Sequence, residues 1–161
     1  MLTHLELLKE VASEGKKTFI STGMSTYQDI DRAVAIFKNH NCPIILMHTI
    51  STYPSDEKDL NLKMISVLRE KYNLPVGYSG HEASVSPSVM AAMLGAVAIE
   101  RHITLDRSMY GSDQSASLEQ SGLENLVSVI RKIPTIIGDG IKKFDENEQK
   151  IANKLRYFEH A

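Results

Sequence analysis

Apolar residues along this chain recur with two different spacings. Short continuous apolar runs are typical of buried strands, whereas apolar residues repeated every three or four positions are typical of helices. Strands are predicted at residues 18–21, 44–48, 76–78 and 96–102. Helices are predicted at residues 2–14, 61–72 and about 145–158, after Thr26 around Ile30–Phe37, after Pro87, and around Leu123–Ile133. Thr26 and Asp29 resemble a capping box at one helix start.

This order is one helix, then four strand–helix units, then a last helix. Strands joined by crossover helices predict an α/β fold with a parallel sheet and right-handed connections. A small open α/β domain is one solution. The sharper prediction is one half of a TIM-type (β/α) barrel with about four βα units, at residues 1–145, followed by a terminal helix or linker start at residues 146–161. A half-barrel has two unpaired strand edges, so we expect self-association or instability in isolation.

The composition narrows the classes of partner. The 161 residues are 42% hydrophobic and 24% charged with a net charge of -2, which does not predict a nucleic-acid partner. No apolar run reaches the ~20 residues that span a bilayer. The first residues lack the basic segment followed by an apolar one that is typical of a secretory signal. Cys42 is the single cysteine, so it forms no internal disulfide and a reducing cytoplasm is expected.

Polar residues follow each of the four predicted strands. In a parallel barrel the chemistry collects at the carboxyl ends of the strands, so we expect these side chains to meet at one mouth. They are Ser21-Thr22-Gly23, His48-Thr49, Ser79-Gly80-His81 and Glu100-Arg101-His102.

Alternation along the fourth strand places Glu100 and His102 on the inner side, with Ile99 and Ile103 on the opposite, helix-covered side. A buried carboxylate needs a partner, which for Glu100 would be a cation, a metal or a metal-bound water. If His81 shares the inner side, two imidazoles can bind one divalent metal and leave positions open. The alternative is two histidines that only form hydrogen bonds at a strand mouth.

The remaining sequence motifs give weaker evidence about function. The sequence has no G-x-x-x-x-G-K-[ST] and no G-x-G-x-x-G, which argues against a P-loop or a dinucleotide site. The polar loop at residues 106–119 follows the strand that carries His102. Loops in this position build substrate sites, but a solvated connection would have the same composition.

The order of these motifs is similar to that of the sialic acid synthase family, which includes N-acetylneuraminate, legionaminate and pseudaminate synthases and spore-coat polysaccharide synthases. The resemblance covers about residues 2–145. It rests on these motifs: Ile20-Ser21-Thr22-Gly23-Met24-Ser25-Thr26, Ser51-Thr52-Tyr53-Pro54, Gly77-Tyr78-Ser79-Gly80-His81-Glu82, Glu100-Arg101-His102-Ile103-Thr104-Leu105-Asp106 and Gly111-Ser112-Asp113-Gln114-Ser115-Ala116-Ser117-Leu118-Glu119.

The resemblance implies a transferase of sialic acid biosynthesis that condenses phosphoenolpyruvate with an N-acetylmannosamine-type sugar to give a nonulosonate and phosphate. It implies a divalent metal held by His81 and His102, typically Mn²⁺, with Mg²⁺ or Co²⁺ as alternatives, and Glu100 close to that metal. The substrate-binding residues it implies are Ser21 and Ser79 for phosphate, Tyr53 and Asp113 for the sugar, and Ser115 in the last motif.

The resemblance also implies that residues 1–161 lack two parts that family members have. Family members are about twice as long, so we expect the N-terminal barrel half and the C-terminal antifreeze-like domain to be absent here. Three interpretations follow: a fragment, a chain that pairs with a separate half or a second copy, and a non-catalytic assembly module. A metal-dependent aldolase or a keto-deoxy-sugar phosphate synthase on the same barrel is the rival enzyme class. We expect little synthase activity from this chain alone.

Overall fold

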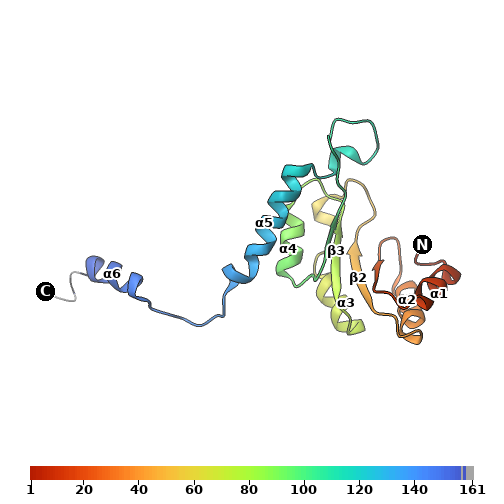
Figure 1. The fold of residues 1–161 in the computed structure, drawn as a ribbon, viewed down its shortest axis with the longest axis horizontal. Helices are drawn as coiled ribbons and strands as arrows, with labels where there is room; N and C mark the ends of the chain where they lie inside the picture. Colours follow the sequence, from red (N-terminus) through yellow and green to blue (C-terminus); the bar gives the residue numbers. More distant parts are fainter. Residues whose placement is uncertain (157, 159–161) are drawn as a thin grey trace. The chain divides into compact units, whose positions relative to one another are not determined.

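The computed structural model describes residues 1–156 and 158 of the chain, which divides into two units, Met1–Arg131 and Lys132–Ala161. The first unit alternates helices and strands in the predicted order (Figure 1). Its elements are α1 (Leu5–Ser13), β1 (Thr18–Ser21), α2 (Tyr27–Asn39), β2 (Ile44–Thr49), the 3-10 helix η1 (Glu57–Asp59), α3 (Met64–Tyr72), β3 (Val76–Gly80), α4 (Ser86–Met93), β4 (Ile99–Arg101) and the 3-10 helix η2 (Gln114–Ala116). Helix α5 (Gln120–Ile137) begins in this unit and ends in the second, which also contains α6 (Glu146–Leu155).

The four strands form one parallel sheet in the order β1-β2-β3-β4, as predicted. The register pairs Ser21 with Met47, Thr49 with Ser79, and Ser79 with Glu100. Because neighbouring strands are in this register, every second residue of each strand lies in a continuous row on one face of the sheet. Within the described residues, β1 pairs only with β2 and β4 only with β3, so each leaves one edge unpaired.

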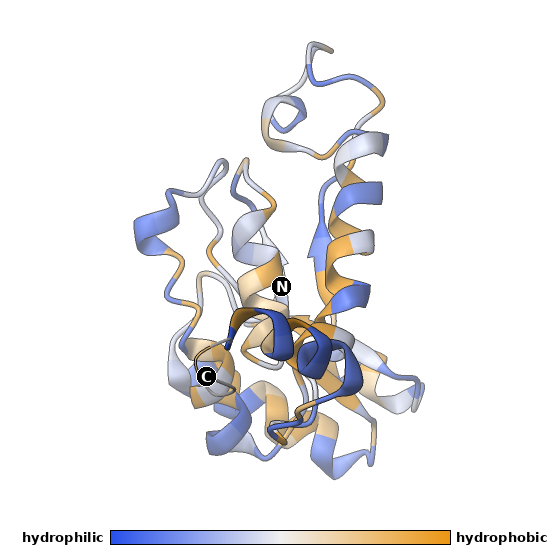
Figure 2. Ribbon diagram, turned by 90° about the vertical axis from the view of Figure 1, so that its left-hand side faces the viewer, coloured by the Kyte–Doolittle hydropathy of each residue, from blue (hydrophilic) through white to orange (hydrophobic). Residues whose placement is uncertain are grey.

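One face of the sheet, which we call the outer face, carries the hydrophobic core. Leu46, Val76 and Tyr78 are fully buried there against the apolar stripes of α2 and α3, which include Phe37 and Ile65. Helix α5 is amphipathic, and Figure 2 shows hydrophobic and hydrophilic bands along it. Helices α2 and α3 therefore stabilise the sheet through the outer face.

The opposite face, which we call the inner face, is only partly covered. Phe19 on β1 is 52% exposed, although aromatic side chains are usually well buried. Glu100 on β4 is also exposed, whereas Met47, Thr49 and Ser79 are buried between them. The inner face is thus apolar toward the amino ends of the strands and polar toward their carboxyl ends.

Local sequence signals explain where several elements begin and end. The predicted capping box is present: Thr26 Oγ1 accepts from Asp29 N at 3.3 Å, and Asp29 Oδ2 accepts from Thr26 N at 2.9 Å. The predicted strand at 96–102 is shorter, because Gly95 adopts a positive φ of 89° and Ala96 N still donates to Ala91 O at the end of α4. Helix α3 likewise begins three residues late, after Asn61 with its φ of 44°.

The second unit holds the charged helix that the sequence predicted. Helix α6 is capped by Asp145, whose Oδ1 accepts from the backbone N–H groups of Asn147 and Glu148 at 2.9 Å each. The predicted continuation beyond Arg156 lies outside the described residues except for Phe158. Among the helices that the structure describes, none has the length and apolar character needed to cross a bilayer.

Candidate functional site

A cavity of about 460 Å³ opens on the inner face of the sheet. Its polar wall comes from the carboxyl ends of the four strands and the segments that follow them, and its apolar wall comes mainly from α1 and β1. The polar residues are Ser21, Thr49, Ser51, Ser79, His81 and Glu100. Strand alternation therefore brings together the polar strand ends, as predicted.

The imidazoles of His81 and His102 lie next to each other at the mouth of this face. Their ring centroids are 5.2 Å apart and the ring planes are nearly perpendicular, at 81°. The tyrosine predicted to lie near the sugar also belongs to this group, because the Tyr53 ring is 5.3 Å from that of His81 and 4.7 Å from that of His102. The two histidines thus lie on one side of the sheet, close enough to share a ligand.

Hydrogen bonding fixes the protonation pattern of the His81 ring. Its Nδ1 lies 2.7 Å from the carbonyl oxygen of Ile50. A carbonyl can only accept, so Nδ1 carries the proton and Nε2 of the neutral ring keeps its lone pair. The backbone carbonyl of His81 also accepts from Ser55 N at 3.0 Å. This is the arrangement that orients a metal-binding histidine in proteins.

His102 is held more loosely, on the exposed side of the pair. Its Nδ1 is 3.8 Å from Oδ2 of Asp113, and both side chains are about half exposed. The backbone carbonyl of His102 accepts from Leu118 N at 2.9 Å, which ties β4 to the end of the 106–119 loop. The loop therefore brings Asp113, a predicted sugar contact, next to the histidine pair.

Glu100 lies beside Ser79 rather than in a closed pocket. Ser79 Oγ donates to Glu100 Oε1 at 2.8 Å. We expected a buried carboxylate partnered by a cation, a metal or a metal-bound water. The expected burial is wrong, because the Glu100 carboxylate is exposed, with Ser79 as its hydroxyl partner. Of the residues expected on the other face, Ile99 packs on the core, but Ile103 is 68% exposed, contrary to the prediction, because β4 ends at Arg101.

Ser21 and Ser115, two further residues predicted to bind substrate, lie in different parts of the structure. Ser21 lines the inner cavity with Ser79. Ser115 is exposed and does not line it; its carbonyl accepts from Arg107 Nε at 2.8 Å, which braces the loop. Thr49, one of the polar strand-end residues expected at the mouth, is buried, and its Oγ1 finds no hydrogen-bond partner among the described residues.

Sequence reasoning missed a charged pair on the outer face. Glu82 is fully buried and forms an ion pair with Arg101, with Arg101 Nη1 3.1 Å from Glu82 Oε1. Burial and the neighbouring Glu82 carboxylate raise the pKa of Tyr78, whose hydroxyl donates to Glu82 Oε2 at 2.8 Å. Alternation could have found the pair, since residues next to inner-face histidines must face the core, where a lone charge is costly.

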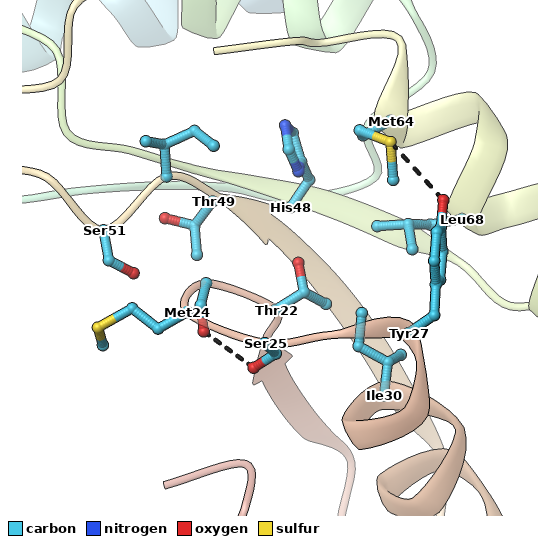
Figure 3. A pocket seen from close by; sticks show the side chains of 12 residues that line it. Thr22, Met24, Ser25, Tyr27, Ile30, His48, Thr49, Ser51, Met64 and Leu68 are labelled. Carbon is cyan, nitrogen blue, oxygen red and sulfur yellow. Dashed lines mark hydrogen bonds between the residues drawn. The ribbon is translucent and has the colours of Figure 1, made fainter. Parts of the chain in front are cut away.

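A second cavity, of about 380 Å³, lies between α2, α3 and the ends of β1 and β2 (Figure 3). It shares Thr49 and Ser51 with the inner cavity. Its histidine, His48, is buried, and its Nε2 donates to the Leu60 carbonyl at 2.7 Å. Burial lowers the pKa of His48, so this ring favours the neutral form. It is a core histidine, unlike the half-buried His81 and the exposed His102 on the inner face.

The chain belongs to the NeuB family, whose model matches residues 1–142. It is 39% identical over 158 residues to a protein from Campylobacter jejuni named N,N'-diacetyllegionaminic acid synthase, covering 96% of this chain and 47% of that protein. It is 41% identical over 150 residues to the N-acetylneuraminate-9-phosphate synthase of Drosophila melanogaster, covering 89% of this chain and 40% of that one.

Among solved structures, an N-acetylneuraminic acid (sialic acid) synthetase from Leptospira borgpetersenii matches with a TM-score of 0.82 and 36% identity. The match covers 96% of this chain and 55% of that one. The sequence thus spans about half the length of the relatives it matches. The family and the parallel sheet together confirm the half-barrel prediction.

Proposed function

We propose that this chain forms the metal-binding half of a synthase that condenses phosphoenolpyruvate with an N-acetylmannosamine-type sugar. The observation that carries the proposal is the pair of neighbouring imidazoles, His81 and His102, at the carboxyl ends of adjacent parallel strands. The names of the relatives support a nonulosonic acid as the class of product for this chain. Which amino sugar the chain would take is left to experiment.

The side chains present fit a divalent metal with an incomplete ligand set. No group of three or more histidine, cysteine, aspartate or glutamate side chains that could hold a metal occurs within residues 1–156 and 158. His81 and His102 would be the protein ligands, with oxygen atoms from water, substrate or another barrel half completing the set. Two nitrogen and several oxygen ligands suit Mn²⁺, with Co²⁺ and Mg²⁺ as alternatives. Such a metal would polarise the sugar aldehyde.

The reaction needs groups that hold two substrates against each other. Carbon 3 of phosphoenolpyruvate forms a bond to the aldehyde carbon, water adds to carbon 2, and phosphate leaves with cleavage of its C–O bond. Ser21 and Ser79 lie in the inner cavity, where Ser21 can donate to a phosphate oxygen, and Ser79 would do so once its hydroxyl turns away from Glu100. Tyr53 and Asp113 lie beside the histidine pair and would orient sugar hydroxyls, with Ser115 farther along the same loop.

We propose that the remaining barrel half comes from outside residues 1–161, as a separate segment or a second copy. Phosphate carries several negative charges, and the polar residues that line the inner cavity include no lysine or arginine. Neutral hydroxyls alone would hold phosphate weakly, so this chain alone is expected to show little turnover. The single thiol of Cys42 is buried and free, which fits the reducing cytoplasm as the compartment.

Metal titration of the whole chain tests the proposal. Mn²⁺ binding is measured by electron paramagnetic resonance or calorimetry for the unmodified chain and for His81→Ala, His102→Ala and His40→Ala. Each of the first two variants is expected to lose at least tenfold in affinity. His40 is an exposed histidine at the end of α2, and its variant serves as the matched control. Equal affinities in all four proteins would overturn the metal assignment.

Product analysis tests the reaction class. A complementary barrel half is added, and the sugar-acid product is identified after incubation with N-acetylmannosamine and either phosphoenolpyruvate or pyruvate. Nonulosonate from phosphoenolpyruvate alone supports the proposal. Product from pyruvate would indicate an aldolase, and product from phosphorylated aldoses without an acetamido group would indicate a keto-deoxy-sugar phosphate synthase.

A further inference from the structure

The buried ion pair on the outer face is built from the sequence neighbours of the two histidines. Glu82 directly follows His81, and Arg101 directly precedes His102. The Glu82 side chain is fully buried, and only 3% of the Arg101 side chain is exposed. Two charges are rarely buried in this way without a reason beyond stability, because an apolar pair of similar volume is often at least as stable.

Arg101 holds the backbone after His81 as well as the carboxylate. Its Nη1 donates to the carbonyl of Ser84 at 2.9 Å and to Ser88 Oγ at 3.1 Å, and its Nη2 donates to the carbonyl of Glu82. A planar guanidinium with several fixed donors can make all these bonds at once. The segment that leaves β3 is therefore bound to β4 through one side chain.

The glycine before His81 makes room for this contact. The Glu82 carboxylate turns back over Gly80, and a Cβ on Gly80 would lie 2.8 Å from both carboxylate oxygens and 2.9 Å from a Tyr78 ring carbon. Gly80 is in register with Arg101 on β4. Any side chain at Gly80 would thus displace the carboxylate from its partner.

We propose that Glu82 and Arg101 are a positioning pair that sets the separation and orientation of the His81 and His102 imidazoles. The backbone on the carboxyl side of His81 is bound to β4 by Arg101, and the ring itself is bound to the β2–α3 segment through Nδ1 and Ile50. With both attachments in place, the ring has one tautomer and one direction. This inference rests on the proposed function, because it is the histidine pair that the outer-face pair positions.

The variants must separate positioning from folding. Removing one partner alone leaves an unpaired buried charge, which would destabilise the sheet strongly and obscure an effect on the histidines. The double variant Glu82→Leu with Arg101→Met replaces the pair by apolar side chains of similar size and leaves no charge behind. Ser88→Ala is the matched control, because it removes a bond from α4 to the same cluster while the ion pair stays.

Two readouts are measured on the whole chain, with folding checked by circular dichroism and urea unfolding. The first is Mn²⁺ affinity, which we expect to fall ten- to hundredfold in the double variant, as for other partners behind metal ligands, and to stay within threefold in Ser88→Ala. The second needs no metal: ¹⁵N NMR of the imidazoles should show one His81 tautomer in the unmodified chain and tautomer averaging in the double variant.

These readouts distinguish the two proposals. If the unmodified chain binds no Mn²⁺ but the tautomer signature is lost in the double variant, the metal assignment fails and the positioning pair stands. A folded double variant with unchanged tautomer and unchanged affinity would overturn the positioning pair alone. If the double variant does not fold, Gly80→Ala makes the same test, because it displaces the carboxylate without removing a charge.

Discussion

The two faces of this sheet each carry a glutamate, and the two residues differ in almost every physical respect. Glu82, on the outer face, has no exposed surface and is bonded to Arg101, Tyr78 and Ser88. Glu100, on the inner face, is exposed and accepts one hydrogen bond, from Ser79. The outer face therefore holds its charge in a closed network, and the inner face presents its charge to whatever enters the cavity.

This difference indicates a supporting role for the buried Glu82 and a role in ligand binding or chemistry for the exposed Glu100. A buried, fully bonded carboxylate cannot approach a substrate, but it can fix the backbone beside groups that do. An exposed carboxylate near two imidazoles is free to meet a cation or a hydroxyl. The comparison between the faces can be tested by changing matched residues on each.

The largest contrast is expected between the two glutamates themselves. Glu82→Gln leaves the Arg101 guanidinium buried without its counter-charge, so the free energy of unfolding should fall by about 3–5 kcal/mol. Glu100→Gln keeps an acceptor for Ser79 on an exposed site and should change it by less than about 0.5 kcal/mol. Urea unfolding at pH 7 measures both. Similar losses in the two variants would show that the inner face is also closed in solution.

The next contrast uses apolar residues. Leu46 is fully buried on the outer face, so Leu46→Ala should lower the free energy of unfolding by about 2–5 kcal/mol. Phe19 is 52% exposed on the inner face, so Phe19→Ala should cost much less, about 1 kcal/mol. The measurement is urea unfolding at two protein concentrations.

Unfolding at two protein concentrations tests whether a second copy of the chain covers the inner face. If two copies cover each other's inner faces, Phe19→Ala should cost more at high concentration and should shift the light-scattering mass toward the monomer. A monomer at every concentration, with Phe19 contributing little, would contradict the expected self-association of the half-barrel.

Much of the first unit was predictable from the sequence because local signals decide it. Apolar periodicity predicted each strand of the sheet, and the capping box at Thr26 and Asp29 was correct even with aspartate in its last position. The errors lie at element ends. Residues 96–98 were assigned to a strand, but Gly95 and the last bonds of α4 keep Ala96 in the turn.

The candidate site was also predictable from the sequence only in part. Strict alternation was enough to place Glu100 and His102 on one face, and it placed Ser79 and His81 there only if the strand geometry extended that far. It was not enough to predict that Glu100 would be exposed, because exposure depends on what covers the face and not on the strand itself. The role of Arg101 was missed because its carbonyl partners, Glu82 and Ser84, lie in a turn before α4 whose path the sequence does not specify.

The smallest expected effect compares the buried His48 of the outer face with an exposed histidine through pH. Burial lowers the pKa of His48 below its ordinary 6.5, so between the two pKa values the unfolded chain binds more protons than the folded one. The stability that His48 contributes is therefore present above pH 6.5 and is lost as the pH falls below it, with a slope of at most about 1.4 kcal/mol per pH unit for one proton. The nearby Tyr78 ring, 6.1 Å away, stays neutral in this range because burial raises its pKa.

His48→Gln keeps a donor for the Leu60 carbonyl but does not titrate, so it should flatten the loss of stability between pH 7 and pH 5. His40→Gln, at an exposed histidine, should leave that loss unchanged. Urea unfolding at intervals of half a pH unit measures the slopes. A slope that survives in His48→Gln would assign the acid sensitivity to other groups, and the inner-face histidines would then be the next to replace.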